Sequence, residues 1–522
     1  MKGIRLIKLL FLMVSLGFSL VLSAQENAMP ERVDLAQLRA CLDQAGSVTI
    51  EKNLLLQVLV VSEPGNPNLE QNFQRHYSMM KSIPTDRKVY VESKDGSLGL
   101  ALNCVSSDVV AKMARFSTVV LSLKGCTLTR EDNPVRYTLS DVAEENIVRV
   151  YPGTADRLPY KERRYCQLKD EDLYTFVILK DAEFVLKDGS FADVYETYAM
   201  KNGLNDAAAP NSSMDGWATL LCDADGSLWY ILINGKTPWR RNGIALPQGA
   251  GDIGGILVHT PLPRYGGDVL GRYQLRPLFR EEIGLDPALA AANWKTLVEW
   301  NWNGGGELWR PDSGEGSLSC SVKGKCYRGN DLNNTRVEPK NGEAVRGKRG
   351  MVTKGALTVK AAARDWWTWP SREPAYVQID FSTAGLDGKS LLFGFAFAAG
   401  NIEPDTSFGF PVYWTVDYAV DGGAYHPVSS EEFILRSMPW WWGKQVEGIN
   451  YITSLEAGFG QTQHAILLPQ DVVGHAKVSL RLHPSRPNIA TLAMEQADNV
   501  LIRENIKETT FVNFGSFVIR YK

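Results

Sequence analysis

The sequence predicts an all-β protein in which two small tandem barrels precede a β-sandwich. Two observations lead to this fold class. A short hairpin pattern occurs twice in the first half of the chain, and the second half contains many runs in which apolar and polar residues alternate. With 522 residues, 44% apolar and 22% charged, the chain has the composition of ordinary globular protein. Its length fits about three domains.

The first 24 residues are expected to form a secretory signal peptide. Lys2, Arg5 and Lys8 precede an apolar run over residues 9–22, and Leu-Ser-Ala at 22–24 offers a cleavage site. The run is shorter than the ~20 residues that span a bilayer, so we expect no transmembrane segment in the mature chain. The protein should therefore be exported to the periplasm, the outer surface or the medium.

The hairpin pattern is Asp-Gly-Ser-Leu, at residues 95–98 and again at 225–228. Asp-Gly between apolar runs is a strong hairpin signal, and we expect a positive φ at both turn positions. Residues 123–125 and 253–255 match at the same offset, and Arg136-Tyr137 and Arg272-Tyr273 follow in the same order. Ordered matches predict an internal duplication. A coincidence of short matches is the alternative.

Each repeat, at residues 31–155 and 160–285, is expected to hold five strands. The first repeat also predicts a helix over 34–42, with Asp34 and Gln37 as a capping box, and a helix near 108–115 before its fourth strand. Five strands with a helix between the third and fourth is the order of an OB-like barrel. The expected strands are 54–62, 88–93, 98–104, 117–123 and 136–142, then 174–184, 218–222, 228–233, 253–259 and 272–278.

These repeats resemble OB-like domains of secreted bacterial proteins, some of them attached to extracellular nucleases. They are most similar to an uncharacterised OB-like family at the N-terminus of Gram-negative surface proteins. The resemblance implies a fold and an exported location, but no activity. The residues that carry it are Glu51–Leu54, Leu123–Gly125, Thr129–Pro134, Arg136-Tyr137 and Arg272–Leu278.

Nucleic-acid binding by the barrels is one hypothesis, which we do not favour. Barrels that bind nucleic acid stack bases on aromatic side chains in a basic groove. The best candidate is Trp229, and we expect it to pack against the neighbouring barrel instead. The aromatic and basic residues just beyond it are Lys236, Trp239, Arg240 and Arg241. The long segment Glu63–Arg87 is expected to be a surface loop without chemistry.

Residues 290–522 predict a β-sandwich of jelly-roll kind. Eleven of the 14 Trp lie here, and many apolar residues alternate with polar ones, as strands of a two-sheet sandwich require. The run Trp414–Tyr425 resembles a hairpin of galactose-binding-like and adhesion-type jelly rolls. The residues expected to face inward are Val298, Trp300, Trp302, Val377, Ile379, Phe381, Leu391, Phe393, Phe395, Phe397, Trp414, Val416, Tyr418, Val420, Val478, Leu480 and Leu482. Opposite the Phe393 strand, Gly394, Ala396 and Ala398 predict a closely packed neighbour.

Two tryptophan clusters are the candidate ligand-binding residues. Both flank a proline and neither alternates, so both are expected in loops. Exposed aromatic rings offer flat apolar faces on which a sugar can stack. Alternatively, the rings plug the ends of the sandwich. The clusters are Trp366, Trp367 and Trp369, and Trp440, Trp441 and Trp442.

The sequence contains no Gly-x-Ser-x-Gly, His-Glu-x-x-His, P-loop or dinucleotide-binding motif. A hydrolase with an unrecognised carboxylate pair remains an alternative, and its candidates are the loop residues Asp312, Glu315, Glu431 and Glu432. No cofactor is expected. The loop 312–316 could hold a structural Ca²⁺, although its ligand spacing matches no known calcium-binding loop. Of seven cysteines, Cys320 and Cys326 could form a local disulfide in an oxidising compartment.

We therefore expect an exported, non-catalytic protein that binds glycan or another surface ligand through loops of the sandwich. The net charge of -3 is too small to direct the protein to nucleic acid or an anionic membrane. The sequence does not define the oligomeric state.

Overall fold

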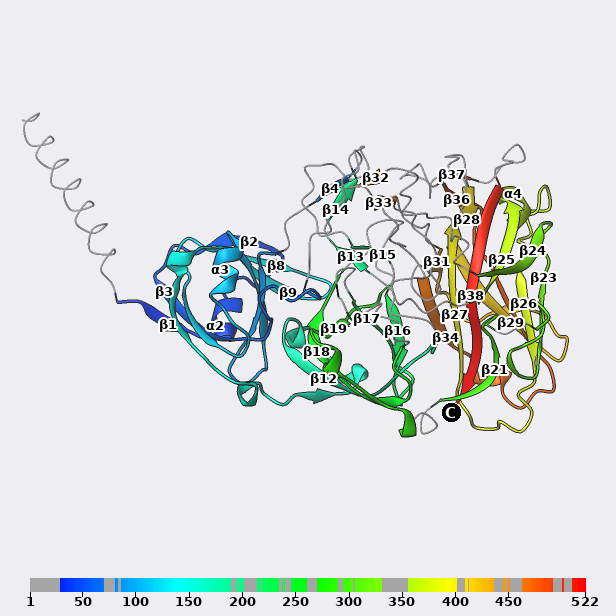
Figure 1. Ribbon diagram of the computed structural model, residues 1–522, viewed down its shortest axis with the longest axis horizontal. Helices are drawn as coiled ribbons and strands as arrows, with labels where there is room; N and C mark the ends of the chain where they lie inside the picture. The colour runs from blue at the N-terminus through cyan, green and yellow to red at the C-terminus, as the bar shows by residue number, and fades with distance from the viewer. Residues whose placement is uncertain are drawn as a thin grey trace, which may run out of the picture. The chain divides into compact units, whose positions relative to one another are not determined.

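The computed structural model consists mainly of strands (Figure 1). The chain forms two compact units, residues 1–64 with 87–159, and residues 65–86 with 160–522. The signal peptide lies outside the described residues, and the expected boundary near residue 290 remains a prediction. The structure describes residues 29–69, 80–82, 86–188, 194–196, 198–200, 214–216, 218–233, 237, 239, 246–260, 270–289, 294–303, 306–330, 355–400, 409–411, 413–435, 445–446, 449–450, 462–491, 500–501 and 509–522.

The first unit is a barrel with the strand order expected of an OB-like fold. Its strands are β1 (Glu31–Val33), β2 (Gly46–Thr49), β3 (Leu54–Val60), β5 (Lys88–Glu92), β6 (Gly99–Cys104), β7 (Thr118–Ser122), β8 (Thr127–Glu131), β9 (Arg136–Val142) and β10 (Ile147–Tyr151). Strands β2 and β3 act as the first barrel strand, and β7 and β8 as the fourth. The fifth, β9, pairs in parallel with the third, β6, which closes the barrel.

The helices of this unit are short, and the first of them carries the capping box that the sequence predicts. Helix α2 (Leu35–Arg39) begins after Asp34, whose carboxylate accepts from the Gln37 N–H, while the Gln37 side chain accepts from the Asp34 N–H. Helix α3 (Ser107–Ala111) lies between the third and fourth strands and is capped by Ser106. In the described part of the chain, no helix has the length and apolar character to cross a membrane.

The second barrel repeats the pairing order of the first. Its strands are β11 (Glu162–Arg163), β12 (Phe176–Phe184), β16 (Thr219–Cys222), β17 (Leu228–Ile231), β18 (Ala250–Val258), β19 (Gln274–Arg276) and β20 (Ile283–Asp286). As in the first barrel, the third strand, β17, pairs in parallel with the fifth, β19. The first strand, β12, pairs with the fourth, β18, and this pairing closes the barrel. Each barrel also has a short additional strand that pairs in parallel with its first strand, β11 with β12 and β1 with β3. The shared topology supports the duplication.

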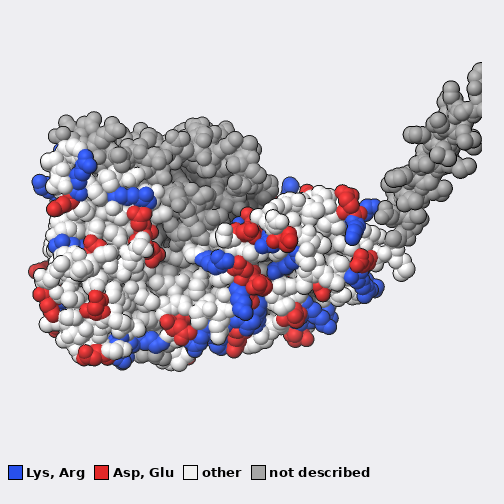
Figure 2. Space-filling view, turned by 180° about the vertical axis from the view of Figure 1, so that it is seen from behind, with Lys and Arg blue, Asp and Glu red and all other residues white. Residues whose placement is uncertain are grey.

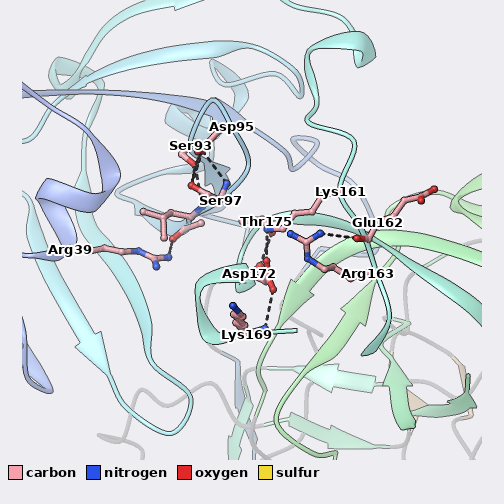
Figure 3. A network of polar contacts seen from close by, with 12 residues as sticks. Arg39, Ser93, Asp95, Ser97, Lys161, Glu162, Arg163, Lys169, Asp172 and Thr175 are labelled. Atoms are coloured by element: carbon pink, nitrogen blue, oxygen red, sulfur yellow. Dashed lines mark hydrogen bonds and ion pairs between the residues drawn. The ribbon is translucent and has the colours of Figure 1, made fainter. Parts of the chain in front are cut away.

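The two Asp-Gly-Ser-Leu turns form hairpins, but only the glycines have positive φ, +70° at Gly96 and +86° at Gly226. The expectation of a positive φ at Asp95 and Asp225 is wrong. The N–H of Gly96 donates to the carbonyl of Ser93, and this turn leaves only the glycine in the left-handed region. Asp95 instead accepts hydrogen bonds from Ser93 and Ser97 (Figure 3), and these bonds lower the pKa of its carboxyl to about 2.

The matched turns allow a controlled test. A Cβ at Gly96 would lie 2.9 Å from the Pro159 Cβ, whereas at Gly226 the nearest atom, of Trp294, is at 3.5 Å. We expect Gly226→Ala to cost about 1 kcal/mol through the positive φ alone. Gly96→Ala should cost roughly 1–3 kcal/mol more, because it adds overlap. Hydrogen exchange of the flanking strands measures both losses, and a smaller loss at Gly96 would contradict the structure.

The described start of the segment Glu63–Arg87, residues 63–69, does not fit the expectation of a surface loop. Asn66 and Asn68 are buried, and the Asn68 amide donates to the carbonyls of Leu232 and Pro277 at the ends of β17 and β19. Arg276 donates in turn to the Asn68 carbonyl. Because buried carbonyls require donors, the start of this segment completes the second barrel.

The C-terminal part is a sandwich of two sheets. One sheet contains β21 (Lys295–Trp300), β22 (Ser313–Gly314), β24 (Lys325–Asn330), β25 (Gly355–Ala362), β27 (Leu391–Gly400), β34 (Thr462–Leu467) and β38 (Thr509–Tyr521). The other contains β23 (Ser317–Cys320), β26 (Val377–Phe381), β29 (Tyr413–Val420), β30 (His426–Pro427), β31 (Phe433–Ile434) and β35 (Val478–Pro484). Apart from Val420, which packs against it half-buried, every residue expected to face inward belongs to the core between them. Period-two alternation therefore predicted the core well.

Shorter elements complete the described structure. The remaining helix is α4 (Ala363–Trp366), before β26. The 3₁₀ turns are η1 (Glu144–Asn146), η2 (Ala155–Arg157), η3 (Tyr165–Gln167), η4 (Asp170–Asp172), η6 (Arg280–Glu282), η7 (Pro287–Leu289) and η8 (Gln470–Val472). The short strands are β4 (Met80–Ser82), β13 (Val194–Glu196), β14 (Tyr198–Met200), β15 (Met214–Gly216), β28 (Gly409–Pro411), β32 (Gln445–Val446), β33 (Ile449–Asn450), β36 (Asn488–Thr491) and β37 (Val500–Leu501).

The second barrel packs directly on the sandwich. Val185 lies against Gly394 so closely that a Cβ on that glycine would be 2.5 Å from the valine Cγ1, which confirms the neighbour expected opposite the Phe393 strand. Gln463 of β34 accepts from the Leu220 N–H and, through its carbonyl, from the Tyr230 hydroxyl. These contacts make the barrel and the sandwich parts of one compact unit.

Candidate ligand-binding face of the sandwich

The first tryptophan cluster is divided between the core and the surface. Trp366 is fully buried, with its ring centroid 5.0 Å from that of Trp414 in an edge-to-face contact. Trp367 is half-buried, and its backbone forms an isolated antiparallel β-bridge with Pro374. Trp369 is 41% exposed. Within this cluster, Trp366 matches the packing alternative and Trp369 presents a ring to solvent, while Trp440, Trp441 and Trp442 lie outside the described residues.

A tight turn holds Trp369 in place. The Thr368 N–H donates to the Glu373 carbonyl at 2.9 Å, and the Arg372 N–H donates to the Thr368 carbonyl at 2.7 Å. The Arg372 guanidinium lies 5.5 Å from the centre of the Trp369 ring, within the range of a cation–π contact. The turn therefore fixes an exposed indole just before β26 begins.

The outward face of the second sheet carries the polar residues that alternate with its core. In the register, Arg481 of β35 lies between Gln378 of β26 and Asp417 of β29. Because neighbouring side chains on one face of a sheet touch, these strands build a continuous polar surface. We call it the Tyr–Arg face, and it consists of Tyr376, Gln378, Asp380, Asp417, Tyr425, Ser479, Arg481 and His483.

Arg481 is the centre of this face. Its guanidinium carbon lies 3.9 Å from the centre of the Tyr376 ring and 3.6 Å from that of Tyr425. Its Nε donates to the Gln378 Oε1 at 2.8 Å, and the same oxygen accepts from the Tyr425 hydroxyl at 2.9 Å. The guanidinium thus fixes two half-buried tyrosine rings, as a planar cation with stacked partners does.

Hydrogen-bonding groups surround the two rings. His483 Nε2 lies 3.0 Å from Asp417 Oδ2 on one side. On the other side, Asp380 Oδ1 accepts from the Ser479 hydroxyl at 2.5 Å. The face therefore combines rigid aromatic rings with donors and acceptors in fixed positions, the combination that gives a binding site both contact area and orientation.

Sequence reasoning missed the Tyr–Arg face, although a signal for it was present. The inward assignment of Val377 and Ile379 implies that Tyr376 and Gln378 face outward, and that of Leu480 and Leu482 implies the same for Arg481. The alternation of apolar and polar residues does not show which strands are neighbours in the sheet. β26 and β35 lie far apart in sequence and pair only in the folded protein.

The carboxylates considered for hydrolysis either make local hydrogen bonds or are exposed. Asp312 Oδ2 accepts from the N–H groups of Asn301 and Trp302, each at 2.8 Å, so this side chain holds a turn together. Glu432 accepts from Ser485 and Arg486. Glu315 and Glu431 are exposed. Among the described residues, no cluster of three or more His, Cys, Asp or Glu could hold a metal ion.

The other sequence hypotheses concern Cys320, Cys326 and Trp229. Cys320 and Cys326 are free thiols, so the disulfide between them remains a prediction. A hydrogen bond between the two side chains raises the pKa of Cys320. Trp229 is buried and stacks on Tyr165 of its own barrel, at 6.1 Å between ring centres, so it offers no ring to a base. On the face shown in Figure 2, positive and negative side chains are interspersed.

Comparisons with known proteins give only distant structural likenesses. No family model matches the sequence, and no curated protein matches it. The K2 cleaved adhesin domain of Lys-gingipain is 9% identical, with 44% of this chain and 99% of that chain covered and a TM-score of 0.21. The tandem CBM22-1–CBM22-2 domain of Paenibacillus barcinonensis Xyn10C is 10% identical, with 66% and 78% covered and a TM-score of 0.22. A CBM4 structure is 9% identical, with 32% of this chain and 84% of that chain covered and a TM-score of 0.16.

Proposed function

We propose that this chain is an exported, non-catalytic protein that binds glycan through the Tyr–Arg face and the exposed Trp369. The observation that carries the proposal is Arg481 stacked between Tyr376 and Tyr425. The face of an aromatic ring is electronegative, and the CH groups on one side of a sugar ring are weakly positive and apolar, so the two surfaces complement each other.

Two features support a sugar rather than a purely apolar ligand. The rings are bordered by Asp417, His483, Asp380 and Ser479, whose polar atoms can hydrogen-bond to hydroxyl groups. The rings are also fixed before binding, since Arg481 and Gln378 already hold them. A fixed ring loses little conformational entropy when a ligand arrives, which favours affinity.

The test begins with a glycan array on the full chain, followed by calorimetric titration of the glycan that binds best. We expect Tyr376→Ala and Tyr425→Ala each to weaken binding at least tenfold, or about 1.4 kcal/mol. Arg481→Met should weaken it as well, because it releases both rings. The unfolding midpoint of each variant is measured in parallel to show that the sandwich remains folded.

Tyr327 provides a matched control. It is also half-buried and also has a cation beside its ring, with Lys325 Nζ at 5.7 Å from the ring centre, but it belongs to the opposite sheet. Tyr327→Ala should leave glycan affinity unchanged. Equal losses in all three tyrosine variants, or an array on which no glycan is retained, would refute the proposal.

A further inference from the structure

A groove on the first barrel forms a second candidate binding site, separate from the Tyr–Arg face. Its volume is about 970 Å³, which suits a ligand of a few sugar units, since ligand sites span roughly 300–1,000 Å³. Every residue that lines it belongs to the first compact unit. The groove lies on the first and fourth barrel strands, not on the second and third, which OB-like folds commonly use for binding.

The floor of the groove is the outer surface of β3 and β7. Gln57 lies opposite Val120, and Leu59 lies opposite Thr118, in the antiparallel register. Because the backbone groups of these strands are paired within the sheet, a ligand on this floor meets side chains only. An extended peptide that adds a strand needs an unpaired sheet edge, so the floor suits a ligand read by side chains.

Three cations line the groove without a matching set of carboxylates. Arg32, Lys94 and Arg157 are exposed lining residues, and none of them forms an ion pair with any residue that the structure describes. The acidic lining residue, Asp34, already accepts from the Gln37 N–H as a helix cap. The groove is therefore positively charged, in a chain whose net charge is -3, and it favours an anionic ligand.

The groove also presents an aromatic ring. Tyr151, at the end of β10, is 40% exposed, and the Arg149 guanidinium lies 4.8 Å from its ring centre. Together with Leu55 and the aliphatic floor, this ring can pack against the apolar side of a sugar, while Gln57 and Thr118 can hydrogen-bond to its hydroxyls. A nucleic acid would need a series of stacking rings, which the lining does not provide.

We infer that this groove binds an acidic oligosaccharide, a sugar chain that carries carboxylate or sulfate groups. Arg32, Lys94 and Arg157 pair with the anionic groups, and Tyr151 stacks on a sugar ring between them. This site works independently of the sandwich face, so the two can fail separately.

Titration calorimetry on the full chain tests the inference at low and moderate salt. The probes are an oligogalacturonide, which carries carboxylates, a heparin-derived oligosaccharide, which carries sulfates, and a neutral dextran oligosaccharide. We expect at least one acidic probe to bind and the neutral one not to bind, with an affinity that falls as salt rises. The comparison of the two acidic probes identifies which anionic group the groove prefers.

The decisive variant is Arg32→Gln/Lys94→Gln/Arg157→Gln, which should weaken binding of the acidic probe at least tenfold. Its control, Lys52→Gln/Lys112→Gln/Lys124→Gln, removes the same charge from the same unit outside the groove and should leave binding unchanged. Equal weakening in the two variants would show a general charge effect and overturn the inference. Binding of neither acidic probe, or tighter binding of oligothymidylate or a poly-glutamate peptide, would overturn it as well.

Discussion

Replacing Glu183 by alanine is expected to destabilise the second unit by about 3–5 kcal/mol, because the substitution leaves a buried cation without its partner. Glu183 of β12 and Arg520 of β38 are both almost fully buried, and their side chains are 2.5 Å apart. The other carboxylate oxygen accepts from the Trp294 N–H at 2.9 Å. One side chain thus joins the second barrel, the segment that follows it and the last strand of the sandwich.

A third charge makes the loss larger. Lys187 Nζ lies 3.2 Å from the Glu183 carboxylate, and burial, followed by the charge of Arg520, lowers the pKa of this lysine. Without Glu183, the buried Arg520 and the partly exposed Lys187 would have no carboxylate between them. Glu183→Gln should cost less than Glu183→Ala, since the amide oxygen can still accept from the Trp294 N–H.

Tryptophan fluorescence during urea unfolding measures this loss selectively, because every Trp of the chain lies at or beyond residue 217, within the second unit. Glu162→Ala is the control: its ion pair with Lys180, at 3.0 Å, is partly exposed and should contribute less than about 1 kcal/mol. The double variant Glu183→Leu/Arg520→Met should be more stable than Glu183→Ala, since it removes the buried charge as well. A loss at Glu183 no larger than that at Glu162 would contradict this account.

A second buried pair shows the same chemistry within the barrel itself. Lys161 and Asp172 are 2.5 Å apart with both side chains almost fully buried, and Lys161 also donates to the Thr175 hydroxyl (Figure 3). The Asp172 carboxylate accepts in turn from the Lys169 N–H at 2.9 Å. Because its hydrogen bonds are made within the fold, the pair fixes the segment that leads into β12.

Local pattern predicted much of the fold because strands have a period of two. The alternation at Val478, Leu480 and Leu482 identified the core side of β35, and the Asp-Gly turns located both barrel hairpins. The duplication then followed from short matches in one order. These features need only residues close in sequence, which is why sequence analysis could reach them.

The candidate sites depend on contacts that no local pattern encodes. Arg481 meets Tyr376 across 105 positions of sequence, and Asn68 reaches Leu232 across 164. The groove on the first barrel requires β1 to pair in parallel with β3, which brings Arg32 beside Leu55. Which strands become neighbours is set by burial of the whole core, so the polar residues gathered between them could not be grouped in advance.

The tryptophan cluster at residues 366–369 separates stability from binding. Trp366→Ala should reduce the free energy of unfolding by about 3–5 kcal/mol, because it empties a large space in the core beside Trp414 and Phe514. Trp369→Ala should change stability by less than about 0.5 kcal/mol, since its ring lies at the surface. Urea unfolding followed by tryptophan fluorescence measures both changes.

We expect the surface tryptophan, not the buried one, to contribute directly to glycan affinity, which titration measures. Trp369→Ala should weaken binding about tenfold if the exposed indole contacts the ligand together with the Tyr–Arg face, a change of about 1.4 kcal/mol. Trp309 is exposed to a similar extent, 37%, in another turn of the sandwich, and Trp309→Ala should leave binding unchanged. If the two surface variants behave alike, exposure alone does not define the site, and Trp369 has no specific part in binding. A loss of binding confined to Trp369, without a loss of stability, would place the ligand beside the start of β26.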